Sequence, residues 1–121
     1  MKNAIPTVLV VEDDPAILRL IARALSTRGY DVHAVDHPLK ALDIVQAGTC
    51  FDLIISDVIM PEMCGPELLK RLTPFCPQAG VVFISAHTGE EALPQNATFL
   101  SKPFHITDLL SIAEKKAPSR F

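Results

Sequence analysis

The sequence predicts an α/β domain built on a doubly wound, five-stranded parallel sheet. Short runs rich in β-branched residues alternate with segments of helical periodicity along the whole chain. The apolar runs are unbroken, which is typical of strands covered on both faces. No linker, repeat or low-complexity stretch interrupts the 121 residues, of which 49% are hydrophobic. We therefore expect one domain spanning residues 1–121, with its ordered core at 6–116.

The first strand and helix are expected at the start of the chain. Thr7–Val11 is β-branched and apolar, which favours a buried strand. Asp14 is a good N-cap, and Pro15 suits the first position of a helix. Apolar residues then recur at spacings of three and four until Gly29, which predicts the C-terminal stop.

A second strand, a second helix and a third strand follow. Val32–Val35 is expected to be the second strand. Pro38–Gln46 carries its apolar residues on one face and is closed by Gly48, which predicts a helix. Leu53–Ser56 is a third buried strand that ends on Asp57.

The remaining chain repeats the alternation. Pro66–Leu72 is a short predicted helix, and Val81–Ile84 is the fourth strand. Phe99–Leu100 is a short fifth strand. The last helix is expected at Ile106–Lys116, and we expect the tail 117–121 to be frayed.

Composition excludes several functions. Eleven basic against fourteen acidic residues give a net charge of −3, so direct nucleic-acid binding is not expected. No apolar run is long enough to cross a membrane, and no secretory signal is visible. These features favour a cytoplasmic protein.

The spacing of the cysteines and histidines predicts no metal centre that is built from these two residue types. The cysteines are odd in number and lack zinc-ligand spacing, so we expect reduced thiols with at least one buried. The histidines form no cluster. The residues are Cys50, Cys64, Cys76, His33, His37, His87 and His105.

Five chemically active residues fall at the carboxyl ends of the predicted strands: Glu12, Asp13, Asp57, Ser85 and Lys102. Ligands of such sheets bind at this edge. Three neighbouring carboxylates repel one another unless a cation lies between them, and an all-oxygen site favours Mg²⁺, with Mn²⁺ as an alternative. A carboxylate flanked by a metal, a hydroxyl and an ammonium group can receive a phosphoryl group, which makes Asp57 the candidate nucleophile.

Each of these residues also has a purely structural explanation. Glu12 and Asp13 could complement a helix dipole, and Asp57 could start a turn. Ser85 could bond to the backbone, and Lys102 could lie in a solvated loop. The chemical interpretation depends on all five occurring at the correct strand ends of one fold.

The motifs resemble those of the receiver domains of two-component response regulators, in order and over nearly the whole chain. The resemblance implies the flavodoxin-like strand order 2-1-3-4-5 and a phosphorylation-dependent signalling switch. The motifs are VVEDDP at 10–15, DVIMPEMCG at 57–65, ISA at 84–86 and SKPF at 101–104.

The resemblance also implies roles for residues of the site. Asp57 would accept the phosphoryl group from a sensor histidine kinase or a histidine phosphotransfer protein. Glu12, Asp13 and Asp57 would hold Mg²⁺, with Glu12 often acting through water. The backbone carbonyl of Ile59 would complete the protein ligands, and slow self-dephosphorylation would follow. Lys102 would pair with Asp57 or its phosphate.

Two further implications concern the shape of the site. Lys102–Pro103 would be a cis peptide. Ser85 would move to bond a phosphate oxygen, and Phe99 occupies the position of the aromatic switch residue. Simple core packing of Phe99 is the alternative.

The sequence departs from the common family pattern in two places. Cys64 stands where Ser or Asp is common. Ser85 and Lys102 are only seventeen positions apart, and 87–97 contains Gly89 and Pro94, so the helix between the fourth and fifth strands should be truncated or irregular. Such short variants are similar to receivers of hybrid histidine kinases and to some single-domain regulators.

Two other functions compete with the switch. A phosphatase of the haloacid-dehalogenase type would need an acidic residue where the chain has Ile59, so we expect no turnover enzyme. A receiver-like scaffold that acts only by binding partners stays open. The sequence also leaves open the kinase, the stimulus, the oligomeric state, and whether the output is a separate downstream protein or a fused effector.

Overall fold

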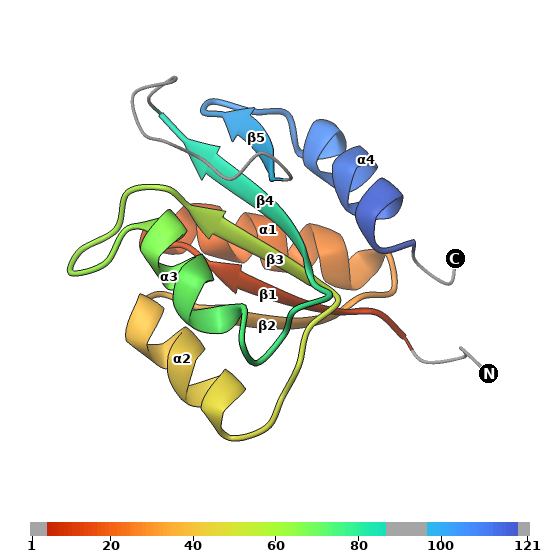
Figure 1. Ribbon diagram of the computed structural model, residues 1–121. Helices are drawn as coiled ribbons and strands as arrows, with labels where there is room; N and C mark the ends of the chain where they lie inside the picture. Colours follow the sequence, from red (N-terminus) through yellow and green to blue (C-terminus); the bar gives the residue numbers. More distant parts are fainter. Residues whose placement is uncertain (1–4, 87–96, 119–121) are drawn as a thin grey trace.

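The computed structural model describes residues 5–86 and 97–118, and its centre is a sheet in which all neighbouring strands run parallel (Figure 1). The strand order is β2-β1-β3-β4-β5. This confirms the predicted fold class and order. The strands are β1 (Thr7–Val11), β2 (Asp31–Val35), β3 (Leu53–Asp57), β4 (Gly80–Ser85) and β5 (Thr98–Ser101).

Helices cover both faces of the sheet. Alternate residues of β1 contact opposite layers, because successive side chains of a strand point to opposite faces. Val8 belongs to the core cluster with Ile21 and Leu109, whereas Leu9 belongs to the cluster with Leu42 and Leu68. α1 and α4 therefore form one layer and α2 and α3 the other (Figure 1). The helices are α1 (Pro15–Thr27), α2 (Pro38–Gln46), α3 (Gly65–Leu72) and α4 (Ile106–Lys116).

Side-chain caps fix where the first two helices begin. The Asp14 carboxylate accepts hydrogen bonds from the backbone amides of Ala16 and Ile17, at 2.9 and 3.3 Å, as predicted for an N-cap. His37 caps α2 in the same way, because its Nδ1 accepts from the amide of Leu39 at 3.0 Å. This capping role of His37 was not predicted.

Several boundaries differ from the predictions by one or two residues. β2 begins one residue earlier than predicted, β3 ends one residue later, and β4 and β5 gain one residue at each end, since pairing with a neighbouring strand continues beyond the apolar run. The end of α1 agrees with the prediction: the helix ends at Thr27, and Gly29, with a φ of 94°, closes it, since the Gly29 amide donates to the Ser26 carbonyl and the Tyr30 amide to the Leu25 carbonyl.

The predicted fraying of the tail is wrong at its first residue. Ala117 is 5% exposed, and its carbonyl accepts a 2.6 Å hydrogen bond from the Tyr30 hydroxyl. Residues 119–121 lie outside the described residues, as does nearly all of 87–97, where a truncated helix was expected. Within the part of the chain that the structure describes, no helix has the length and apolar character needed to cross a membrane.

Candidate functional site

Three strands deliver acidic and polar side chains to one edge of the sheet. Glu12 and Asp13 follow β1, Asp57 ends β3, and Ser85 ends β4. Lys102 comes directly after β5 and faces the same edge, since its Nζ contacts two of these residues. All five predicted site residues are thus together. The strand order reverses between β1 and β3, so the acidic residues flank the point where such sheets bind ligands.

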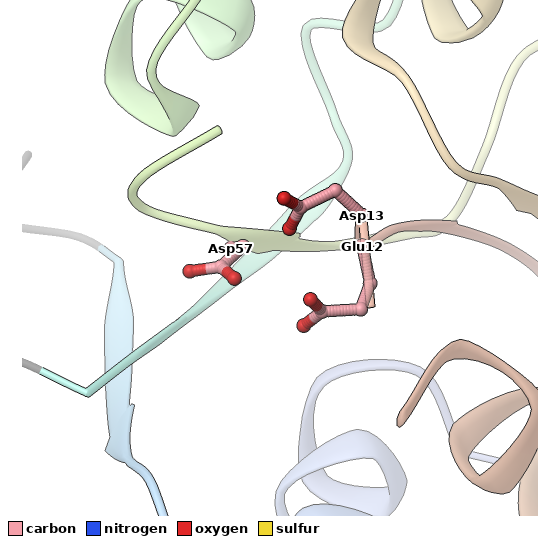
Figure 2. Close-up of side chains that lie close together, drawn as sticks. All are labelled: Glu12, Asp13 and Asp57. Atoms are coloured by element: carbon pink, nitrogen blue, oxygen red, sulfur yellow. The ribbon is translucent and has the colours of Figure 1, made fainter. Parts of the chain in front are cut away.

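The three carboxylates form a compact cluster. One oxygen from each of Glu12, Asp13 and Asp57 lies within 4.8 Å of the others, and the side chains converge on one region in Figure 2. Glu12 and Asp57 are buried, and Asp13 is exposed. The cluster therefore has one side open to solvent.

Lys102 bridges two of the carboxylates. Its Nζ lies 2.9 Å from Oδ2 of Asp57, as a hydrogen-bonded ion pair, and 3.1 Å from Oε1 of Glu12. Burial acts to lower the pKa of Lys102, but the contacts with Asp57 and Glu12 and the negative charges of both carboxylates outweigh it and raise that pKa above its ordinary value. The lysine is therefore charged at neutral pH.

Glu12 is the most strongly perturbed group of the site. Its side chain is 1% exposed, and burial raises its pKa to about 7. The amide of Asp14, which donates to Oε2 at 3.1 Å, and the Lys102 ammonium oppose this effect, while the Asp57 charge adds to it. The contact of Oε1 with Lys102 is close enough for an ion pair but lacks hydrogen-bond geometry, which leaves Oε1 without a hydrogen-bond partner among the described residues.

The loop between β3 and α3 is held tightly against the site. The Val58 amide donates to the Ile84 carbonyl at 2.9 Å, and the Gly65 amide donates to the Val58 carbonyl at 2.7 Å. The Ile59 amide donates to Oδ1 of Asp57 at 3.3 Å, so both carboxylate oxygens of Asp57 accept hydrogen bonds. This arrangement fixes the orientation of the Asp57 carboxylate.

A tight turn at Glu62 shapes the same loop. The Met63 amide donates to the Pro61 carbonyl at 2.8 Å, which closes a three-residue γ-turn around Glu62. Glu62 has a φ of 71°, a left-handed conformation that a side chain with Cβ disfavours. Its Oε1 lies 3.2 Å from Nε2 of His37, so the loop is tied to the start of α2.

The two predicted switch residues lie near each other on the sheet. Ser85 is 1% exposed, and its carbonyl accepts from the Lys102 amide at 2.7 Å. Phe99 is half-buried, pairs in register with Phe83 and packs with Phe83 and Val58. Since Phe83 precedes Ser85 by two positions, Phe99 and Ser85 belong to the same face of the sheet.

The structure adds features that the sequence analysis missed or could only take from resemblance. The direct pair between Lys102 and Glu12 was not predicted, and neither was the link from His37 to Glu62. The signal for His37 was its position immediately before Pro38, as Asp14 precedes Pro15. The Lys102–Pro103 peptide is cis, as the resemblance implied.

The fold and this edge together define a doubly wound α/β domain with a lysine-bridged acidic pocket at the switch point of the sheet. The family profile of the response regulator receiver domain matches residues 8–114. The chain therefore belongs to the response regulator receiver domain family. It is a phosphorylation-dependent switch of two-component signalling and a phosphoacceptor domain.

Relatives and solved structures agree with this assignment. The chain is 38% identical over 116 residues to the sensor kinase CckA of Brucella abortus strain 2308, covering 90% of this chain and 12% of the kinase. It is 35% identical over 113 residues to the receiver protein CpdR of the same organism, covering 89% of this chain and 93% of CpdR. The chain thus spans nearly all of CpdR but only a small part of the sensor kinase CckA.

Similar solved structures include the receiver domain of the hybrid histidine kinase CckA, with a TM-score of 0.80, 38% identity, and coverage of 91% of this chain and 97% of that one. The chemotaxis response regulator CheY4 of Vibrio cholerae gives a TM-score of 0.81 at 29% identity, with 93% and 98% coverage.

Proposed function

We propose that Asp57 is the phosphoacceptor and that Lys102, Ser85 and a bound Mg²⁺ support the transfer. The observation that carries the proposal is the 2.9 Å contact between Lys102 Nζ and Asp57 Oδ2 at the edge of the acidic cluster. The contact joins a buried, oriented carboxylate to a fixed positive charge. A transferring phosphoryl group needs a nucleophile and a neutralising cation in this relationship.

The residues present fit a magnesium ion. All candidate ligands are oxygens, as Mg²⁺ requires: carboxylates of Glu12, Asp13 and Asp57 and the backbone carbonyl of Ile59. The buried Oε1 of Glu12, which lacks a hydrogen-bond partner among the described residues, supports this assignment, as does the raised pKa of Glu12. When bound, Mg²⁺ would neutralise negative charge on the phosphoryl oxygens, and Mn²⁺ could replace it.

The transfer itself uses the Asp57 carboxylate. One of its oxygens attacks the phosphorus of a phosphohistidine, the new O–P bond forms, and the P–N bond breaks as the histidine nitrogen leaves with the electron pair. Lys102 neutralises charge on the phosphoryl oxygens throughout. Later attack by water on the phosphorus releases inorganic phosphate and restores Asp57, which is the slow self-dephosphorylation that we include in the proposal.

We assign the response to Ser85 and Phe99. The Ser85 hydroxyl would shift to donate to a phosphate oxygen, and Phe99 would repack on the face of the sheet that the two residues share. Removing the hydroxyl of Ser85 or the ring of Phe99 should uncouple phosphorylation from the change in structure.

The phosphoryl donor is proposed to be a phosphohistidine of a sensor histidine kinase or of a histidine phosphotransfer protein. An apolar groove beside the site supports this, since it contains Lys102 and is therefore continuous with the phosphoacceptor. Leu20 is 51% exposed there. The groove is lined by Ile17, Leu20, Ala86, Lys102, Pro103 and Phe104. We place the domain in the cytoplasm, where it would signal to a downstream protein or fused effector without binding nucleic acid itself.

Acetyl phosphate tests the proposal. The protein is incubated with Mg²⁺ and acetyl phosphate, and its intact mass is followed over time. We expect one phosphoryl adduct that is lost in Asp57→Asn and with EDTA, and retained in Asp43→Asn, which changes an exposed aspartate of α2. No adduct with any donor or kinase would favour the scaffold, and rapid release of phosphate from unrelated esters would favour an enzyme.

A further inference from the structure

Two cysteines that are distant in the sequence meet at the end of the sheet opposite Asp57. Cys50 lies in the segment that leads into β3, and Cys76 lies just after α3. The chain entering β3 and the chain leaving α3 run to the same end of the sheet (Figure 1). Cys50 is exposed, whereas Cys76 is buried.

The contacts bring the two thiols together. Cys50 Sγ donates to the carbonyl of Phe75 at 3.3 Å, so it lies against the peptide bond that leads into Cys76. Burial raises the pKa of the Cys76 thiol to about 11; hydrogen bonding to the Cys50 thiol adds to this, and the backbone amide of Phe51 opposes it. Cys76 therefore interacts with Cys50 itself and with the residue that follows it.

The third cysteine cannot replace Cys50 as the partner of Cys76. Cys64 immediately precedes α3, and Cys76 follows it. The eight residues of α3 make a helix about 12 Å long at a rise of about 1.5 Å per residue. Because the Cα atoms of a disulfide lie within about 7 Å, Cys64 and Cys76 are too far apart to bridge.

We propose that Cys50 and Cys76 form a disulfide when a peroxide oxidises the exposed Cys50 thiol. In the first step the Cys50 sulfur attacks hydrogen peroxide, which gives a sulfenic acid and one water. In the second step the Cys76 sulfur attacks the sulfenic sulfur, the S–O bond breaks, and the oxygen leaves as a second water with the Cys76 proton. Two thiols and one peroxide thus become one disulfide and two waters.

The order of the two steps follows from exposure. Cys50 is accessible to a peroxide in water, and Cys76 is 4% exposed and holds its proton at neutral pH. The buried thiol is therefore the resolving partner and reacts only with the neighbour it already contacts. The pair lies at the far end of β3 from the phosphoacceptor, so this proposal does not depend on the proposed function.

Peroxide treatment with mass analysis tests the proposal on the full chain. After treatment with hydrogen peroxide at low molar excess, we expect the intact mass to fall by two hydrogens, with a non-reduced peptide linking Cys50 to Cys76 and reversal by dithiothreitol. Cys64→Ser should retain this product as the matched control. Cys50→Ser and Cys76→Ala should both lose it.

A labelling experiment on the reduced protein keeps the proposal testable if a variant fails to fold. Iodoacetamide at pH 8 should modify Cys50 and Cys64, and Cys76 only after unfolding. Oxygen addition at Cys50 with no cross-link, a cross-link through Cys64, or disulfide-linked dimers would each overturn the proposal.

Discussion

Lys102 Nζ lies 2.9 Å from Oδ2 of Asp57, although the two residues are 45 positions apart in the sequence. The same nitrogen lies 3.1 Å from Glu12. One ammonium group therefore balances two buried carboxylates, and the exposed carboxylate of Asp13 extends the cluster toward solvent.

Replacing Lys102 should separate phosphoryl transfer from metal binding. In Lys102→Met the neutralising charge is lost, and we expect phosphorylation by acetyl phosphate to slow by about a hundredfold. Mg²⁺ affinity should be unchanged or higher, because a competing cation is removed. Mass analysis over time and calorimetric titration measure the two quantities. Lys70→Met, which replaces an exposed lysine of α3, is the control. Equal loss of phosphorylation rate and Mg²⁺ affinity in Lys102→Met would contradict the prediction.

Replacing Asp13 should make the metal-free protein more stable. Asp13→Asn removes one of three clustered negative charges, so we expect the free energy of unfolding in EDTA to rise by about 1 kcal/mol. Stabilisation by added Mg²⁺ should largely disappear. Urea unfolding with and without Mg²⁺ measures both effects. A variant that is less stable in EDTA and still gains from Mg²⁺ would show that Asp13 is not a ligand.

Mg²⁺ binding should weaken in acid because Mg²⁺ and a proton compete for Glu12. The raised pKa of Glu12, about 7 against an ordinary 4.5, means that the group is increasingly protonated as pH falls below 7. We expect affinity to fall about tenfold between pH 8 and pH 6. Without metal, Glu12 makes the free energy of unfolding depend on pH in the opposite direction. That free energy declines as pH rises from 4.5 to 7, because Glu12 holds its proton more tightly in the folded state than in the unfolded state.

Calorimetric titrations at several pH values measure this dependence. Glu12→Gln, which cannot lose a proton, is the control and should bind weakly with little change across the same range. A pH-independent affinity in the unaltered protein would contradict the assignment of Glu12 as a ligand.

Gly65 should tolerate no side chain. A Cβ there would lie 2.9 Å from the Phe83 ring and would also meet the Asp57 carbonyl, so a rigid backbone and a buried ring would have to move. We expect Gly65→Ala to cost about 3 kcal/mol of folding free energy. Gly48→Ala is the control: its φ of 111° is unfavourable but the space is open, and a loss of about 1 kcal/mol is expected. Equal losses in denaturant unfolding would refute the steric argument.

The γ-turn at Glu62 should be relieved by glycine. We expect Glu62→Gly to be about 1 kcal/mol more stable than Glu62→Ala, since both lose the pair with His37 but only glycine accepts a φ of 71° without strain. Chemical denaturation of the two variants gives the difference. If Glu62→Ala were the more stable variant, the backbone conformation of Glu62 would not be a source of strain.

Local patterns were sufficient for most of the fold. Unbroken β-branched runs predicted the strands. The start of α1 at Asp14 and Pro15 and the range of α4 at Ile106–Lys116 were also predicted correctly, since caps and periodicity are properties of neighbouring residues. Strand ends were less well predicted, because hydrogen bonding to a neighbouring strand continues past the last apolar residue. The strand order came from the motif resemblance rather than from the pattern itself.

The positions of residues along the chain are enough to predict which side chains reach the functional edge, because parallel strands end at one edge and each of these residues follows or ends a strand: Glu12, Asp13, Asp57, Ser85 and Lys102. Their positions along the chain do not predict which of these side chains touch. The pairing of Lys102 with both Glu12 and Asp57, and the meeting of Cys50 with Cys76, depend on how strands and helices distant in the sequence pack together. Such contacts arise from long-range packing, which local spacing does not encode.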